Sequence, residues 1–321
     1  MSAKLPQGIV SQIAPVELPV FENLVTHYDP ETRALWYYLN PQGRACFTPG
    51  LLRDIRALQT LVQTHLSRPE PEARDSIRYL VAASAVKDVF NRGGDLALFA
   101  QAIESGNRAM LAEYGRTCID CVWHNYTSLG IPTLQTISIV QGQAYGGGFE
   151  AAISSNTIIA EESARFRFPE VMFALFPGMG AFSMLSRSIG GGPAERLINT
   201  GDEYTSRQLY DIGAIHEVVE DGEGVKAVQN FIRRHSRAAP GLLAMRQVRQ
   251  RVQTLEYSEL MDVLNVWVDT AMKLSRRDLK LMQAFADRQE KQMKQPESRE
   301  TSQVLPFPAM LPHGGAQSFA H

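Results

Sequence analysis

Three consecutive glycines, Gly146-Gly147-Gly148, stand directly before Phe149 and Glu150 near the middle of the chain. Glycine lets the backbone turn tightly and come close to a ligand. A helix predicted to begin there points its first N–H groups, and the positive end of its dipole, toward the loop. That arrangement suits an oxyanion that develops during a reaction, with the carboxylate of Glu150 in the same first turn. An ordinary strand-to-helix turn, with a glutamate favoured by the dipole, also explains these residues.

Two other stretches carry a similar combination of glycine and acidic side chains. Residues 91–95 read Asn-Arg-Gly-Gly-Asp, and residues 169–180 begin with Pro169-Glu170 and end with a Pro-Gly-Met-Gly turn. A carboxylate beside a proline in an apolar setting, such as Glu170, is costly unless it is partnered or functional. Taken singly, the first stretch is explained by a turn and Glu170 by a surface position.

The chain has three cysteines, and two of them form a C-x-x-C pair, Cys118 and Cys121, three residues before His124. A metal or redox site is one interpretation, but no second ligand pair of matching spacing occurs. The pair falls on the apolar face of a predicted helix, which favours buried small side chains. So few cysteines in a chain of this length argue against a disulfide framework and for a reducing compartment.

The elements that must position these residues alternate between strand and helix, which is typical of βα units with parallel strands. The apolar patterns predict strands over residues 33–39, 79–83, 133–140 and 158–160, and helices over residues 51–66 and 107–128. After Pro240 the pattern is nearly strand-free. We therefore predict an extended arm (1–28), an α/β core domain (29–238), a helical C-terminal subdomain (239–295) and a flexible tail rich in Pro, Ser and Gly (296–321).

Composition limits the possible functions. The 321 residues are 44% hydrophobic and 21% charged, with a net charge of -2. Such a balance predicts a folded globular chain without nucleic-acid or anionic-membrane binding, although a local basic patch for an acidic carrier protein is compatible with it. No apolar run approaches the length of a membrane span, and the N-terminus lacks a signal-peptide h-region, so we expect a cytoplasmic location.

Together, the Gly-Gly-Asp loop, the Gly-Gly-Gly-x-Glu loop and the Pro-Glu and Pro-Gly-x-Gly turns resemble the crotonase (enoyl-CoA hydratase/isomerase) superfamily in order and spacing. The resemblance covers about residues 30–235. It implies an α/β fold built as a crotonase-like spiral of repeated ββα units, with a helical C-terminal subdomain. Within the superfamily the chain is most similar to diffusible signal factor (DSF) synthases, in residues 43–47, 88–99, 146–152, 157–162, 169–183 and 267–272.

The resemblance implies a 3-hydroxyacyl thioester on acyl carrier protein as the substrate. Gly94 and Gly147 match the two backbone N–H donors of the family's oxyanion hole, and Glu150 and Glu170 match its acid/base pair. The expected reaction is dehydration to a cis-2-enoyl thioester, followed by hydrolysis that releases a cis-2-unsaturated fatty acid quorum-sensing signal. Neither a metal nor another cofactor is needed, because the two N–H groups can hold the enolate charge.

Four side chains are predicted to line the acyl-chain pocket, three because they lie near these loops and Trp267 because the helical subdomain commonly closes sites in this superfamily. Ordinary core packing also explains all four: Tyr145, Phe149, Met179 and Trp267. Other expected partners are a sensor or regulator protein and further copies of the chain, as a trimer or hexamer. Two alternatives remain open at this point. One is a generic enoyl-CoA hydratase or isomerase on CoA thioesters. The other is a non-catalytic crotonase-fold signalling partner, which the presence of both glutamates disfavours.

Overall fold

The computed structural model describes residues 15–236 and 239–291, and two β-sheets form its centre. The larger sheet has the order β1-β2-β3-β5-β7-β10. Strands β1 and β2 are antiparallel, and the other neighbours are parallel. Its strands are β1 (Leu24–Asp29), β2 (Ala34–Leu39), β3 (Tyr79–Ser84), β5 (Gln135–Val140), β7 (Thr157–Glu161) and β10 (Glu217–Val219).

The smaller sheet has the order β4-β6-β8-β9, and three of its strands each follow a strand of the larger sheet along the chain. Strand β4 (Val89–Asn91) follows β3, β6 (Gln143–Tyr145) follows β5, and β8 (Arg165–Arg167) follows β7, whereas β9 (Glu203–Thr205) pairs antiparallel to β8. A helix comes after each such pair of strands. This repeat confirms the predicted ββα architecture.

Both faces of the larger sheet are buried, which explains why its strands read as continuous apolar runs. On β2, Leu35, Tyr37 and Leu39 belong to the main core, whereas Trp36 and Tyr38 face the opposite way. Helices α1 (Pro49–Leu66) and α4 (Arg108–Tyr126) contribute to the main core, and α9 (Gly224–Ser236) contributes to the core on the other face. The remaining helices of the α/β part are α2 (Pro71–Arg74), α3 (Leu96–Glu104), η1 (Ser128–Gly130), α5 (Gly147–Ile153), η2 (Pro169–Phe173), α6 (Ala181–Ile189), α7 (Gly191–Thr200) and α8 (Ser206–Asp211).

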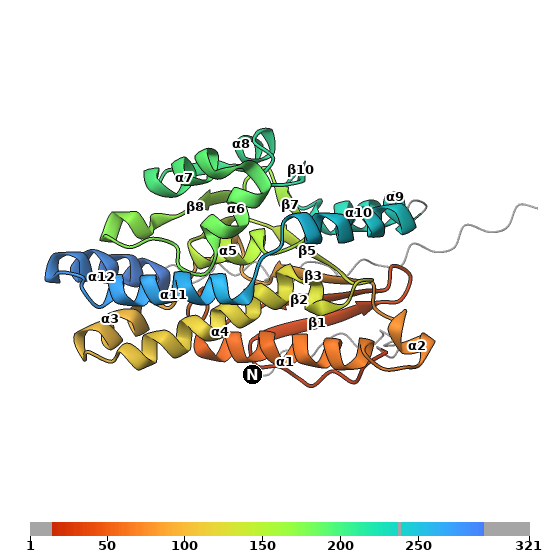
Figure 1. Cartoon of the computed structure of the whole chain (residues 1–321), viewed down its shortest axis with the longest axis horizontal. Coiled ribbons are helices and arrows are strands. Elements are labelled where there is room, and N and C mark those ends of the chain that lie inside the picture. The colour runs from red at the N-terminus through yellow and green to blue at the C-terminus, as the bar shows by residue number, and fades with distance from the viewer. Residues whose placement is uncertain (1–14, 237–238, 292–321) are drawn as a thin grey trace, which may run out of the picture.

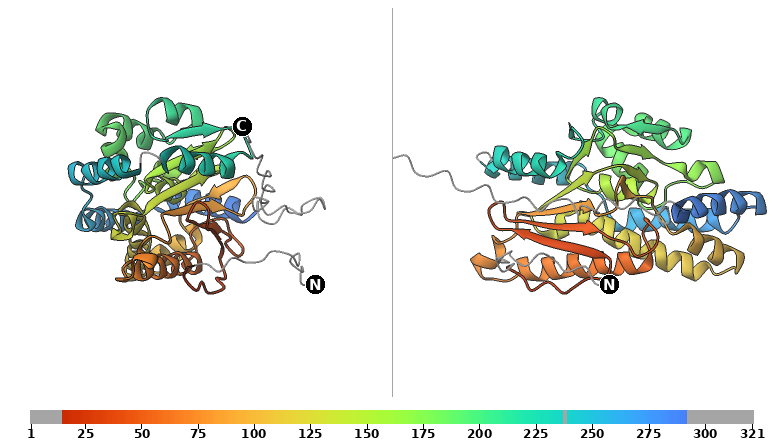
Figure 2. Two further views of the ribbon diagram at one scale, coloured as in Figure 1. Left: turned by 90° about the vertical axis from the view of Figure 1, so that its right-hand side faces the viewer. Right: turned by 180° about the vertical axis from the view of Figure 1, so that it is seen from behind.

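The segment after residue 239 forms the helices α10 (Ala239–Val252), α11 (Tyr257–Ala271) and α12 (Arg276–Lys291). Helix α11 packs on α4, as the light blue and yellow helices in Figures 1 and 2 show, and α12 packs on α3 and η2. Helices α11 and α12 therefore add buried side chains to the main core. Within the ranges that the structure describes, no helix is long and apolar enough to cross a membrane.

The predicted boundary between arm and core, at residues 28 and 29, falls inside β1 and needs correction. Strand β1 pairs along its whole length with β2, and Leu24 is buried, so residues 24–28 belong to the larger sheet. Residues 1–14 of the predicted arm and the predicted tail, 296–321, lie outside the described residues.

Candidate active site

The loops that follow β4 and β6 touch each other through their glycines. A Cβ atom added at Gly93 would lie 2.8 Å from the amide nitrogen of Gly147, and one added at Gly147 would lie 3.4 Å from the amide nitrogen of Gly94. Gly147 is the first residue of α5, so its N–H has no acceptor within the helix. The structure thus brings the two amides that the family pattern assigns to an oxyanion hole next to each other.

Gly146 has a backbone conformation that other residues rarely adopt, with φ 51° and ψ -124°. A Cβ atom there would lie 2.3 Å from Oε1 of Glu170. The glycine therefore allows the Glu170 carboxyl to lie directly against the start of α5.

The Glu150 side chain is buried, with 2% of the residue exposed, and is held by the turn between η2 and α6. Its Oε1 accepts hydrogen bonds from the backbone N–H of Met179 (2.7 Å) and of Ala181 (3.1 Å). Burial raises the pKa of Glu150 to about 7, and the two N–H donors oppose that rise by stabilising the charged form. The predicted Pro-Gly-Met-Gly turn therefore orients this carboxyl.

Glu170 enters the site from the first turn of η2, directly after Pro169. Its Oε2 is buried and accepts no hydrogen bond from the described part of the chain. Burial, with the nearby charge of Glu150, raises the pKa of Glu170 to about 8. An unpartnered buried carboxyl oxygen favours the protonated form and is available to a substrate.

The two carboxyls interact electrostatically, so their titrations are coupled. Burial raises the pKa of both carboxyls toward neutrality, and the charge of Glu150 disfavours ionisation of Glu170, so near neutral pH the pair can share one proton. In that state the site offers one proton donor and one proton acceptor beside two neighbouring amides. This combination suits proton transfer next to a carbonyl whose oxygen becomes negative.

One mostly apolar cavity includes both glutamates together with Gly94, Gly146 and Gly147. Of the four predicted pocket residues, Met179 and Trp267 line this cavity. The Trp267 ring packs edge-on against Phe99, with ring centres 5.1 Å apart. A Cβ atom at Gly178 would lie 2.4 Å from the Trp267 indole, so the turn that holds Glu150 packs closely on this ring.

The structure does not place the other two predicted pocket residues, Tyr145 and Phe149, on the cavity. The Tyr145 hydroxyl donates to the carboxylate of Glu203 on β9, because side chains alternate along β6 and Ala144 takes the buried face. Phe149 is fully buried between Phe166 and Phe168, with ring centres 5.0 and 4.8 Å away. Its role is packing of α5 on the smaller sheet.

Several cavity residues were not predicted as site residues from the sequence. Arg92, in the Gly-Gly-Asp loop, lines the cavity, and its Nε donates to Oε1 of Gln143 at 3.0 Å. Tyr37, Asn125, Ser138 and Ser154 line it from β2, α4, β5 and the end of α5. Strand register and the packing of α4 and α5 on the sheet bring these four together from distant parts of the chain.

Cys118 and Cys121 lie on the buried face of α4 as free thiols, and both line the cavity. Burial raises the pKa of both thiols, so they are protonated near neutral pH. Among the described residues, no group of three or more His, Cys, Asp or Glu side chains could hold a metal ion. The position of the pair agrees with small buried side chains.

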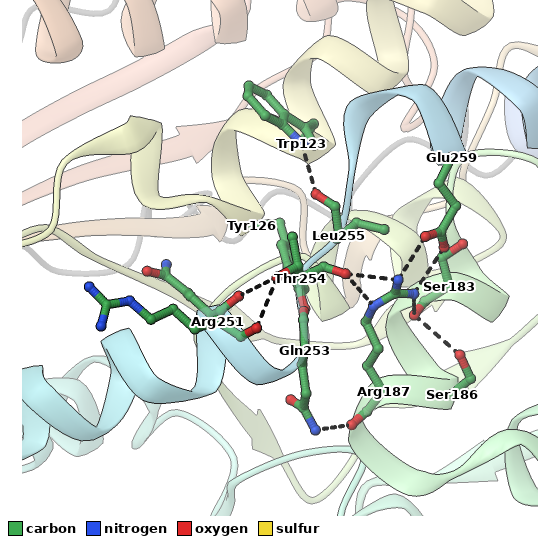
Figure 3. A network of polar contacts seen from close by, with 11 residues as sticks. Trp123, Tyr126, Ser183, Ser186, Arg187, Arg251, Gln253, Thr254, Leu255 and Glu259 are labelled. Atoms are coloured by element: carbon green, nitrogen blue, oxygen red, sulfur yellow. Dashed lines mark hydrogen bonds and ion pairs between the residues drawn. The ribbon is translucent and has the colours of Figure 1, made fainter.

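Arg187 on α6 joins this helix, which follows the turn that holds Glu150, to α11, the helix that carries Trp267 (Figure 3). Its Nη1 and Nη2 donate to the two carboxylate oxygens of Glu259 at 2.9 and 2.7 Å. Nε and Nη2 also donate to the carbonyl oxygen of Thr254, at 3.1 and 2.9 Å. Helix α6 begins at Ala181, whose N–H donates to Glu150, and it carries Arg187, which binds α11. One short helix therefore positions both the Glu150 carboxyl and the helix that carries Trp267.

Comparison with known proteins agrees with this geometry. Residues 63–296 match the family model described as enoyl-CoA hydratase/isomerase. The alpha subunit of the fatty acid oxidation complex of Pseudomonas savastanoi is 30% identical over 48% of this chain, a match that spans only 21% of that subunit's length. Enoyl-CoA hydratase from Bacillus halodurans superposes with a TM-score of 0.66 and 21% identity, covering 82% of this chain and 100% of that one. DspI of Pseudomonas aeruginosa superposes with a TM-score of 0.63 and 21% identity, covering 84% and 98%. These two structures confirm the predicted fold.

Proposed function

The chain belongs to the enoyl-CoA hydratase/isomerase family, and from that premise we propose that it dehydrates a 3-hydroxyacyl thioester and then hydrolyses the product to a cis-2-unsaturated fatty acid. The observation that carries the proposal is the interacting pair of carboxyls, Glu150 and Glu170, beside the neighbouring amides of Gly94 and Gly147. Among the described residues, Oε2 of Glu170 is buried without a hydrogen-bond partner, a cost that a purely structural role does not explain.

In the dehydration, the ionised carboxylate of the pair takes the proton from C2 of the acyl chain. The electrons of the C–H bond move toward the thioester carbonyl, and the enolate oxygen is held by the amides of Gly94 and Gly147. Each such donor contributes on the order of 3 kcal/mol to the barrier reduction. The protonated carboxyl then gives its proton to the C3 hydroxyl, the C–O bond breaks, and water leaves. The pair again holds one proton.

In the hydrolysis, an ionised carboxylate takes a proton from a water molecule, whose oxygen attacks the thioester carbon. The tetrahedral intermediate carries its negative charge on the same oxygen, so the same two amides hold it. Collapse of the intermediate breaks the C–S bond, and the thiol leaves with a proton from the pair. One site can therefore serve both steps.

Acyl carrier protein is the proposed donor of the acyl chain, and the support for it is the likeness of residues 88–99 and 169–183 to the DSF synthases. A sensor or regulator protein that receives the signal, and assembly as a trimer or hexamer, are parts of the same proposal. The family match itself favours a second candidate, hydration or isomerisation of enoyl-CoA thioesters without release of acid.

The test is incubation of the purified full chain with a 3-hydroxyacyl chain linked either to carrier protein or to CoA, with products analysed by mass spectrometry. The proposal predicts free cis-2-enoic acid, formed faster from the carrier-linked substrate. Enoyl or isomerised thioester without free acid supports the second candidate. Full cellular function of the double variant Glu150→Gln/Glu170→Gln would show instead a non-catalytic protein.

A further inference from the structure

The inner end of the cavity rests on the larger sheet, where three lining residues lie in one row across neighbouring strands. Tyr37 on β2 pairs with Ala82 on β3, and Ala82 pairs with Ser138 on β5. All three line the cavity, so they share one face of the sheet. Neighbouring strands lie about 4.8 Å apart, which puts the outer two backbones roughly 10 Å from each other. The small Ala82 leaves room between them for the long side chain of Tyr37.

This end lies about one helical turn along α5 from Glu150. Ser154 ends α5 one helical turn after Glu150, and its N–H donates to the Glu150 carbonyl at 3.1 Å. Four residues of helix correspond to about 6 Å along the axis. A chain whose C2 and C3 lie beside Glu150 therefore reaches Ser154 with carbons well beyond C3.

A chain of polar groups crosses the inner end. The Asn125 side-chain Nδ2 donates to the hydroxyls of Ser154 and Ser155, both at 2.9 Å, and Ser155 bonds Ser138 at 2.7 Å. Each of these four residues is at most 6% exposed. The Asn125 donors are therefore used, whereas its Oδ1 accepts no hydrogen bond from the described residues.

The Tyr37 hydroxyl is the second group without a partner. The residue is 6% exposed, and its hydroxyl makes no hydrogen bond within the part of the chain that the structure describes. Both residues line the cavity, and neither atom is among the fully enclosed atoms without a partner, so both atoms are open to a group that enters the cavity. A hydroxyl group on a bound chain can accept from Tyr37 and donate to Asn125, whereas an alkyl group can do neither.

We propose that the inner end of the cavity recognises a hydroxyl group carried by the acyl chain beyond C3, so that the preferred substrate is a hydroxylated rather than a plain alkyl chain. This inference rests on the proposed function for the position of the chain. An alkyl end would displace water from Tyr37 and Asn125 without replacing its hydrogen bonds. A site built to bond a hydroxyl discriminates strongly against an analogue that lacks it.

The experiment compares 3-hydroxyacyl thioesters of one chain length, either plain or with a second hydroxyl at successive positions beyond C3. We expect kcat/KM for the best hydroxylated chain to exceed that of the plain chain at least about tenfold. Tyr37→Phe removes only the hydroxyl and should bring the ratio to within about twofold. The matched control, Tyr38→Phe, lies on the same strand but on the opposite face and should leave the ratio unchanged.

A binding measurement separates this inference from the proposed function. The affinity of wild type for the free hydroxylated acid and for the plain acid is measured by calorimetry. A protein that turns over neither thioester but binds the hydroxylated acid at least tenfold more tightly refutes the function and keeps the inference. Equal binding of both acids, or a preference that survives Tyr37→Phe, overturns the inference and leaves an ordered water as the partner of Tyr37.

Discussion

Replacement of Gly146 by alanine tests whether Glu170 must lie against the start of α5. The added Cβ would lie 2.3 Å from Oε1 of Glu170, whereas an ordinary contact begins near 3.4 Å, so the carboxyl must withdraw by roughly 1 Å. A misplacement of about 1 Å costs on the order of 100-fold in rate. The backbone conformation of Gly146, φ 51° and ψ -124°, adds strain of about 1–3 kcal/mol for a residue with a side chain.

We therefore expect Gly146→Ala to lower kcat about 100-fold and the melting temperature by several degrees. The rate is followed by the ultraviolet absorbance of the conjugated enoyl thioester, and unfolding by calorimetry. The matched control is Gly213→Ala, which also has a positive φ of 77° but has no atom within 4 Å of the added Cβ. That variant should lose some stability but keep kcat within about twofold.

A folded Gly146→Ala protein with kcat within threefold of wild type would refute the reasoning, because Glu170 would then tolerate the displacement. An equal loss of kcat in Gly213→Ala would also refute it, since strain far from the site would account for the whole effect.

Three further predictions concern the charges and the cavity. The kcat/KM profile should be bell-shaped with limbs near pH 7 and 8. Because its pKa is raised, folded Glu170 keeps a proton that the unfolded chain releases above about pH 4.5, so the free energy of unfolding should fall from there to about pH 8. Glu170→Gln should flatten that fall when unfolding is measured by calorimetry, and an unchanged slope would contradict the prediction. Arg187→Ala should lower the free energy of unfolding by about 1–2 kcal/mol and raise KM. The control, Arg207→Ala, breaks an exposed ion pair and should change neither quantity much. If the two variants changed unfolding and KM equally, the role of Arg187 would be contradicted. Trp267→Ala should extend the range of chain lengths accepted in turnover assays, and an unchanged range would count against its place on the cavity wall.

The two candidate glutamates could be singled out from sequence because each stands in a short motif. Glu150 comes just after three glycines at a helix start, and Glu170 follows a proline in a short apolar stretch. The contact of Glu150 with the backbone N–H groups of Met179 and Ala181 could not be predicted, because it joins segments about 30 residues apart. The main strands and helices of the core could be predicted because each is marked by a local apolar pattern, such as the run at residues 135–140.

The cavity wall could not be predicted in this way, because it depends on register between distant segments. Tyr145 was expected on the cavity from its closeness to the glycines, but alternation along β6 turns it toward Glu203. Tyr37 was not expected there, since only the pairing of β2 with β3 and of β3 with β5 reveals its face. Strand β1 was missed because its residues, LVTHYD, lack a clear apolar alternation, and apart from Leu24 they are only half-buried. Pairing with β2 is what makes them a strand.

The central claim is that Glu150 and Glu170 move the C2 proton of an acyl thioester held by Gly94 and Gly147. The most direct measurement uses a 3-hydroxyacyl thioester carrying deuterium at C2, with loss of that deuterium followed by mass spectrometry. We predict that wild type removes one deuterium from C2 in each dehydration, and that Glu150→Gln/Glu170→Gln removes none above background. Loss of deuterium with the double variant at the wild-type rate, or wild-type turnover that leaves both C2 deuterium atoms in place, would contradict the account.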